Sequence, residues 1–197
     1  MKLLAFSDLH LGRAAARAIV EASAEADLVI GAGDFCNMRV GLREAMAMLE
    51  GIKAPIVMVP GNAESADELR RAAPQGATVL HGEAARVCGL DLYGLGYGVP
   101  VTPFGAWSCD LSEAEAEAHL AGCRAADILI THSPPRGAVD ITSMGKSVGS
   151  NAIRAAIERV QPRLALCGHI HDSAGQKARI GATEVVNLGP KVTWFRL

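Results

Sequence analysis

The chain has 197 residues, of which half are hydrophobic and a fifth are charged, with a formal net charge of −2. These values are typical of one soluble globular domain over residues 1–197, long enough to bury a core without disulfides. The charge argues against a bound nucleic-acid duplex, because proteins that bind duplexes usually carry a clear excess of Lys and Arg.

The first third of the chain alternates predicted strands with predicted helices. The strands are short apolar runs, and the helices are Ala-rich or have apolar residues at helical spacing. The predicted strands are Leu3–Phe6, Asp27–Ile30 and Ile56–Val59, and the predicted helices are Arg13–Ala26, Val40–Leu49 and Ser65–Ala73. Short connections between them indicate βαβ units and a parallel sheet.

The pattern changes in the middle of the chain. Short strands separated by glycines, at Thr78–Leu80, Ala85–Cys88 and Leu90–Leu95, indicate an antiparallel region. The segment Gly96–Ser108 then reads as a long loop rich in Gly, Pro and aromatic residues. A loop of this length is often a lid or a binding loop, and the alternative is a surface crossing held by its own aromatic side chains.

The last part of the chain returns to alternating elements. Ser112 and Glu115 form a predicted capping box for a helix that runs to Ala121, and Ser150 is the predicted cap of a second helix. This second helix covers Asn151–Val160, and the predicted strands are Ile128–Ile130, Leu164–Cys167, Lys177–Ile180, Glu184–Asn187 and Val192–Phe195.

Five of the apolar runs end in side chains of the types that bind metal ions. These residues are Asp8, His10, Asp34, Asn62, His132, His169 and His171. In open α/β sheets, sites form outside the carboxyl ends of the strands, so these side chains can converge from distant parts of the sequence. Period-two geometry sends His169 and His171 to the same side of an extended segment, so both could face one ion cluster.

Seven ligands are too many for one tetrahedral ion and suit two ions that share a bridging carboxylate. Mixed nitrogen and oxygen ligands without thiolate favour Mn, Fe, Co, Ni or Zn over Ca or Mg. Two divalent ions outweigh the charges of Asp8 and Asp34, even with a bridging hydroxide, and would attract an anion. Such a pair of ions can hold a hydroxide nucleophile and neutralise the oxygens of a phosphoryl group.

The blocks around these residues resemble the calcineurin-like metallophosphoesterase superfamily and, more narrowly, its small prokaryotic Icc-related members. The blocks are Ser7-Asp8-Leu9-His10, Gly33-Asp34, Gly61-Asn62-Ala63-Glu64, Thr131-His132 and Gly168-His169-Ile170-His171. The resemblance implies a four-layer α/β/β/α sandwich with two mixed sheets. It also implies that Asp8, His10 and His171 bind one ion, that Asn62, His132 and His169 bind a second, and that Asp34 bridges them.

The implied activity is hydrolysis of a phosphodiester or an activated phosphomonoester by a metal-bridging hydroxide. The family's usual third block has a histidine at position 63 that helps to protonate the leaving group, but here the residue is Ala63. Loss of such an acid typically costs 10²–10⁴-fold in rate, which favours phosphodiesterase over monoesterase activity and leaves the proton donor unassigned. Glu64, the usual partner of that histidine, is expected to stabilise the start of a helix.

The loss of this acid also keeps open an alternative function, a metal-bearing but non-catalytic scaffold that binds other proteins. The presence of all seven ligands favours the enzyme, whose partner would be a small phosphoester. Arg136, Phe104 and Trp107 are candidate substrate contacts, with surface exposure or ordinary packing as the alternatives. The physiological substrate and the oligomeric state are left open.

The cysteines and the apolar runs indicate where the protein is expected to act. Five widely spaced cysteines contain no C-x-x-C pair, which argues against a disulfide framework and favours the reducing cytoplasm. The apolar stretch at the N-terminus is interrupted at Asp8, too early for a signal peptide. No run approaches the ~20 apolar residues of a membrane span, so no membrane partner is expected.

Overall fold

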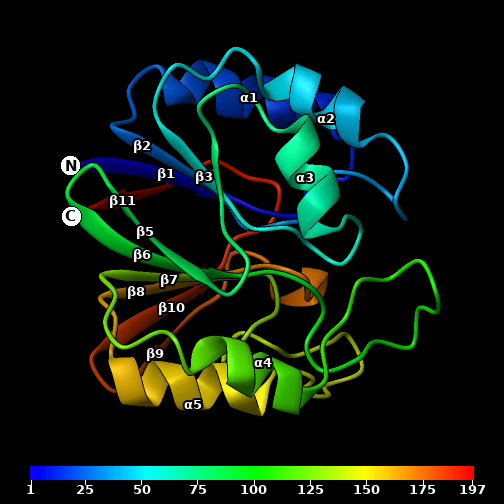
Figure 1. Cartoon of the computed structure of the whole chain (residues 1–197), viewed down its shortest axis with the longest axis vertical. Helices are drawn as coiled ribbons and strands as arrows, with labels where there is room; N and C mark the ends of the chain where they lie inside the picture. The colour runs from blue at the N-terminus through cyan, green and yellow to red at the C-terminus, as the bar shows by residue number, and fades with distance from the viewer.

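The computed structural model describes all residues 1–197 and contains two β-sheets stacked face to face. Helices α1, α2 and α3 cover the outer face of the first sheet, and α4 and α5 cover the outer face of the second (Figure 1). The predicted four-layer α/β/β/α sandwich is therefore confirmed.

The first sheet has the strand order β11-β1-β2-β3-β4. Strands β1 to β4 are parallel, as the βαβ pattern predicts, and β11 pairs with β1 in the antiparallel direction. Its strands and the helices between them are β1 (Lys2–Phe6), α1 (Arg13–Ser23), β2 (Leu28–Gly31), α2 (Leu42–Leu49), β3 (Ile56–Met58), α3 (Ala66–Ala72), β4 (Thr78–Val79) and β11 (Thr193–Arg196).

The second sheet has the order β5-β6-β7-β8-β10-β9. Its four central strands are parallel, and the edge strands β5 and β9 are antiparallel to their neighbours. Its elements are β5 (Glu83–Val87), β6 (Leu90–Leu95), α4 (Glu113–Leu120), β7 (Ile128–Thr131), α5 (Asn151–Val160), β8 (Leu164–Cys167), the short 3₁₀ helix η1 (His171–Ser173), β9 (Lys177–Ile180) and β10 (Thr183–Asn187).

Period-two alternation along the strands produces the layers. In β1, Leu3 and Ala5 face the second sheet within a cluster of 17 buried residues, whereas Leu4 and Phe6 face the helices. Both faces of β1 are therefore apolar, and its ligand-type side chains Asp8 and His10 lie beyond the end of the strand.

Two helix boundaries and the sheet membership of one strand differ from the sequence predictions. Helix α1 ends at Ser23 rather than Ala26, because the next three amides form i→i+3 turn bonds before the chain enters β2. Helix α2 begins at Leu42 rather than Val40, since Val40 closes a tight turn with Asn37 and Gly41 follows with φ of +88°. The predicted antiparallel region holds the β5–β6 hairpin, but β4 belongs to the first sheet, so the chain changes sheets between Val79 and Glu83.

Both predicted N-caps are present. The Ser112 hydroxyl accepts a hydrogen bond from the Glu115 amide, and Glu115 bonds back to the Ser112 amide, which completes the capping box of α4. The Ser150 hydroxyl accepts from the Ile153 amide at the start of α5. The longest helix, α1, has 11 residues, and none of the helices meets the length and hydropathy needed to span a bilayer.

Candidate metal centre

All seven predicted ligand residues lie at one end of the sandwich, beyond the carboxyl ends of five parallel strands. Four follow strands of the first sheet, and three follow strands of the second. In chain order they are Asp8 and His10 after β1, Asp34 after β2, Asn62 after β3, His132 after β7, and His169 and His171 after β8. Each half of the chain therefore contributes ligand-type side chains to the same place.

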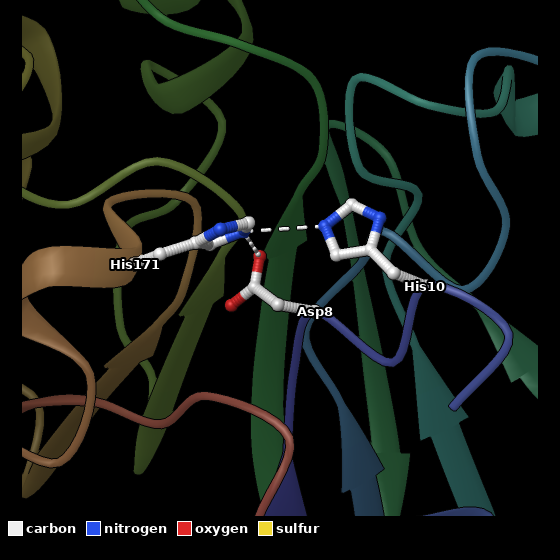
Figure 2. Close-up of side chains that lie close together, drawn as sticks. All are labelled: Asp8, His10 and His171. Atoms are coloured by element: carbon white, nitrogen blue, oxygen red, sulfur yellow. Dashed lines mark hydrogen bonds and ion pairs between the residues drawn. The ribbon is translucent and has the colours of Figure 1, made fainter. Parts of the chain in front are cut away.

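Six of these side chains form two triads, in each of which the candidate ligand atoms lie within 4.8 Å of one another. The first triad is Asp8, His10 and His171, whose side chains point toward one another from two segments, the loop after β1 and the start of η1 (Figure 2). The Nε2 atoms of the two histidines are 3.2 Å apart, and His171 Nε2 is 3.6 Å from Asp8 Oδ1.

The second triad is Asp34, His132 and His169. Asn62 lies beside it, with its Oδ1 atom 3.1 Å from His132 Nε2. The Asp34 carboxylate stands between the two triads: Oδ1 is 3.4 Å from His132 Nε2, and Oδ2 is 3.5 Å from His10 Nε2. One oxygen of Asp34 is thus directed to each triad.

The predicted placement of His169 and His171 on one side of an extended segment is wrong. His169 has a φ of +69° and His171 begins the 3₁₀ helix η1, so the segment is not extended. His169 joins the second triad and His171 joins the first. His169 and His171 therefore lie in different triads, because the backbone turns between them.

Backbone conformation at the site is unusual. Asp8, His10, Asp34 and His169 all have positive φ values, a region that non-glycine residues seldom adopt. Such residues cluster at functional sites, where the surrounding structure holds them in place. The neighbouring glycines allow the close approach: a Cβ atom on Gly61 would overlap Asp34, and one on Gly168 would overlap Asp8.

Hydrogen bonds fix which nitrogen of two imidazoles faces the site. His132 Nδ1 lies 2.9 Å from the carbonyl oxygen of Ala32, and His10 Nδ1 lies 3.1 Å from that of Cys36. A carbonyl only accepts, so each Nδ1 carries the donated proton, and in the neutral ring Nε2 presents a lone pair. The lone pair of His132 Nε2 faces Asn62 Oδ1, and that of His10 Nε2 faces Asp34 Oδ2. Both atoms of each pair are then acceptors, and a bound cation would satisfy them.

Three further residues, none of which the sequence analysis gave this role, hold the ligand segments in place. The Ser7 hydroxyl donates to Asp8, and the His169 amide also donates to the Asp8 carboxylate, at 3.0 Å. The buried Asn187 amide group, at the end of β10, donates to the carbonyls of Val139, Gly168 and Ile170. Glu64, described next, is the third.

The predicted role of Glu64 at a helix start is wrong. Helix α3 is capped by Ser65 and Glu68, whereas Glu64 is fully buried and accepts hydrogen bonds from the backbone amides of Gly61, Asp34, Phe35 and Cys36. The Glu64 carboxylate thereby ties the loop after β3 to the loop after β2. Burial raises the pKa of Glu64 to about 7.

We expect Glu64→Gln to lower the free energy of unfolding by about 3 kcal/mol or more, because an amide NH₂ would face buried donors and bonds to a charged acceptor would be lost. Urea unfolding of the metal-free protein at pH 8 measures the change. Glu117→Gln, at an exposed position of α4, is the matched control and should alter stability by less than about 0.5 kcal/mol. Equal stability of the two variants would contradict the role given to Glu64.

The carboxylates of the site change the acidities of its histidines. Burial alone would lower the pKa of His132, but the carboxylates of Asp34 and Asp8 outweigh it and raise the value to about 9. Burial lowers the pKa of His169 to about 4. In turn, the imidazoles of His132 and His10 outweigh the effect of burial on Asp34 and hold its pKa below the usual range.

A cleft of about 340 Å³ opens over the two triads. Phe104 and Trp107 line it, with their rings stacked at a centroid distance of 5.7 Å, and the ring of Phe104 meets His169 edge-on. Arg136 is exposed and does not line this cleft, so its predicted contact with a phosphate gains no support. The lining residues include no Lys or Arg: His10, Asp34, Asn62, Phe104, Trp107, Thr142, His169, Ile170, His171 and Asp172.

Comparison with known families accounts for this arrangement. The sequence profile of the calcineurin-like phosphoesterase superfamily domain matches residues 1–195, almost the entire chain. The chain belongs to the calcineurin-like phosphoesterase superfamily. The two mixed sheets, their covering helices and the predicted resemblance agree with this membership.

Relatives within the superfamily include the human metallophosphoesterase domain-containing protein 1, which is 38% identical over 96 residues. That match covers 46% of this chain and 29% of the human protein, so this chain matches less than a third of its length. Among solved structures, TT1561 of Thermus thermophilus has a TM-score of 0.73 at 17% identity, covering 98% of this chain and 97% of that one. A dimetal phosphatase from Danio rerio has a TM-score of 0.64 at 13% identity, covering 96% and 88%. At these identities the structures support the superfamily fold alone.

Proposed function

We propose that the protein is a phosphoesterase that works with two divalent metal ions and prefers phosphodiesters to phosphomonoesters. The observation that carries the proposal is the position of Asp34, which directs one carboxylate oxygen to each triad of ligand-type side chains. A carboxylate placed in this way can bridge two ions. Binding and activation of a phosphoester between two ions is a common arrangement in phosphatases and nucleases.

In this proposal Asp8, His10 and His171 hold the first ion. Asn62, His132 and His169 hold the second, and Asp34 joins them. The donors are imidazole nitrogens and carboxylate or amide oxygens, which favours Mn, Fe, Co, Ni or Zn. When bound, the ions would supply an activated water and neutralise the phosphoryl oxygens.

Charge in the cleft supports the preference for a diester. Two divalent ions carry +4 and the carboxylates of Asp8 and Asp34 carry −2, which leaves +2, and Asp172 at the lining lowers this further. No Lys or Arg in the lining adds positive charge. A phosphodiester monoanion therefore suits the site better than a phosphomonoester dianion, and hydroxide also approaches it with less repulsion.

The stacked pair Phe104 and Trp107 is proposed to contact the organic part of the substrate. Phe104 is 49% exposed although its ring is apolar, and both residues lie on the wall of the cleft, with Phe104 beside His169. Planar groups gain about 1–3 kcal/mol per stacking contact with aromatic side chains in nucleic-acid complexes. A substrate with an aromatic or nucleobase group would use this surface.

The test is hydrolysis of bis-p-nitrophenyl phosphate by protein freed of metal and then titrated with Mn²⁺. We expect activity to be absent without metal and to reach its maximum near two equivalents per chain, as measured by elemental analysis. Saturation at one ion would contradict the dinuclear site. A protein with two ions that hydrolyses neither diesters nor monoesters would instead be the non-catalytic scaffold.

Metal loading at pH 7 should release protons. The pKa of His132 is raised to about 9, so this ring holds a proton at pH 7, whereas metal ligation requires the neutral ring. The carboxylate of Asp8 also raises the pKa of His171. Apparent affinity should therefore fall as the pH is lowered and rise toward pH 9. Calorimetry in buffers of different ionisation enthalpy counts the protons.

The matched pair for this measurement is His132→Gln and His119→Gln. The first should release fewer protons on Mn²⁺ binding, and the second, on the surface helix α4, should behave as wild type. Binding without proton release at pH 7 would contradict the prediction.

A further inference from the structure

The loop predicted at Gly96–Ser108 continues in the structure to the start of α4, and we call its residues 96–110 the strap. It is the green loop that projects at the right of Figure 1. Its two ends are joined, since the amide of Gly98 donates to the carbonyl of Cys109 and the amide of Leu111 donates to that of Gly98. The Cys109 amide in turn donates to the main-chain carbonyl of Asn62, at 2.9 Å.

Asn62 is also held by the strap through its side chain. Its Nδ2 atom lies 3.1 Å from Ser108 Oγ, while its Oδ1 atom faces His132 Nε2. A carboxamide can be turned by 180° with little change in shape, and only its hydrogen-bond partners decide whether oxygen or NH₂ faces a given atom. An NH₂ group directed at a cation would not bind it, so the orientation of Asn62 decides whether it can be a ligand.

Asp110 determines whether the Ser108 hydroxyl donates a hydrogen bond to Asn62 or accepts one from it. Ser108 Oγ lies 2.9 Å from Asp110 Oδ1, and Thr102 Oγ1 lies 2.8 Å from Asp110 Oδ2. A carboxylate only accepts hydrogen bonds, so both hydroxyls donate their single proton to it. The lone pairs of Ser108 Oγ then remain free to accept from Asn62 Nδ2, and this polarity keeps Asn62 Oδ1 directed toward the second triad.

We infer that Ser108, polarised by Asp110, is a positioning residue that orients Asn62 toward the second ion. The inference rests on the proposed function only in taking Asn62 as a ligand of that ion. Outer partners of ligands typically contribute 10–100-fold to metal affinity. The strap, which carries Phe104 and Trp107, would thus also fix the orientation of a ligand of the second ion.

Mn²⁺ binding to the full chain, followed by calorimetry and electron paramagnetic resonance, tests this without using catalysis as the readout. Wild type should bind two ions. Ser108→Ala should weaken one of the two binding steps by 10–100-fold and leave the other unchanged, and Ser108→Thr, which keeps the hydroxyl, should restore most of the affinity. Asp110→Asn, whose NH₂ can donate to Ser108 and release its proton toward Asn62, should weaken the same step.

A double-mutant cycle separates positioning from a general loss of structure. In an Asn62→Ala background, Ser108→Ala should have no further effect on Mn²⁺ affinity. Equal weakening of both steps, or a full Ser108→Ala effect in that background, would overturn the inference. If Ser108→Ala left both Mn²⁺ binding steps unchanged, the inference would be overturned and the proposed function would stand. A wild-type protein that binds only one ion would overturn both the inference and the proposed function.

Discussion

Replacing Asp34 by asparagine should weaken the binding of both metal ions together, by at least about a hundredfold for each. Asp34 contributes one oxygen to each triad, so a single change removes a charged ligand from both. Loss of outer partners alone typically costs 10–100-fold, and a bridging carboxylate should cost more. Elemental analysis after gel filtration and a Mn²⁺ titration measure the effect.

Asp172→Asn is the matched control for this experiment. Asp172 lines the same cleft but belongs to neither triad, so the variant should keep two ions. The amide of asparagine can still accept the hydrogen bond from the Ala63 amide, so Asp34→Asn should fold. Loss of only one ion from Asp34→Asn would mean that Asp34 is not shared.

Hydrolysis by the wild-type protein should depend steeply on the leaving group, with aryl phosphodiesters cleaved far faster than alkyl phosphomonoesters. Negative charge develops on the leaving oxygen, and Ala63 cannot protonate it. The histidines that line the cleft are all in the proposed ligand set, so none is free to act as the acid. A missing general acid typically costs 10²–10⁴-fold, and leaving groups of low pKa tolerate its absence best.

The measurement is kcat/KM for a series of diesters and monoesters of graded leaving-group pKa. Ala63→His is the informative variant, which should flatten the dependence and raise monoesterase activity if its ring reaches the leaving group. Ala63 is buried and the Glu64 carboxylate is already bonded to four backbone amides, so the new ring would lack this partner and only part of the acid catalysis should return. A flat dependence in wild type would show that another residue supplies the proton.

The sequence predicts the location of the site better than its detailed geometry. Each of the seven ligand-type residues follows a short apolar run, and parallel strands bring the ends of such runs to one edge. Alternation along a strand does not say which sheet the strand joins, so the residues alone predict a parallel sheet with an antiparallel region. The second sheet and the four layers follow from the family resemblance.

Two errors show which physical information a sequence does not carry. The positive φ of His169 depends on contacts with Asp8 from the other end of the chain, and period-two reasoning assumes an extended backbone there. Glu64 has its partners 28 to 30 residues earlier, in addition to nearby Gly61, and no local pattern marks such a contact. Ser108 is likewise 46 residues from Asn62.

The division of the ligands between the two sheets has a thermodynamic consequence. Asp8, His10, Asp34 and Asn62 follow strands of the first sheet, and His132, His169 and His171 follow strands of the second, so each proposed ion would join the two halves of the sandwich. A ligand present at 100 times its dissociation constant adds about 2.7 kcal/mol to the stability of the folded state. Chelation should then loosen this end of the sandwich first, with faster amide exchange in the ligand loops, while the 17 buried residues between the sheets keep the strands protected.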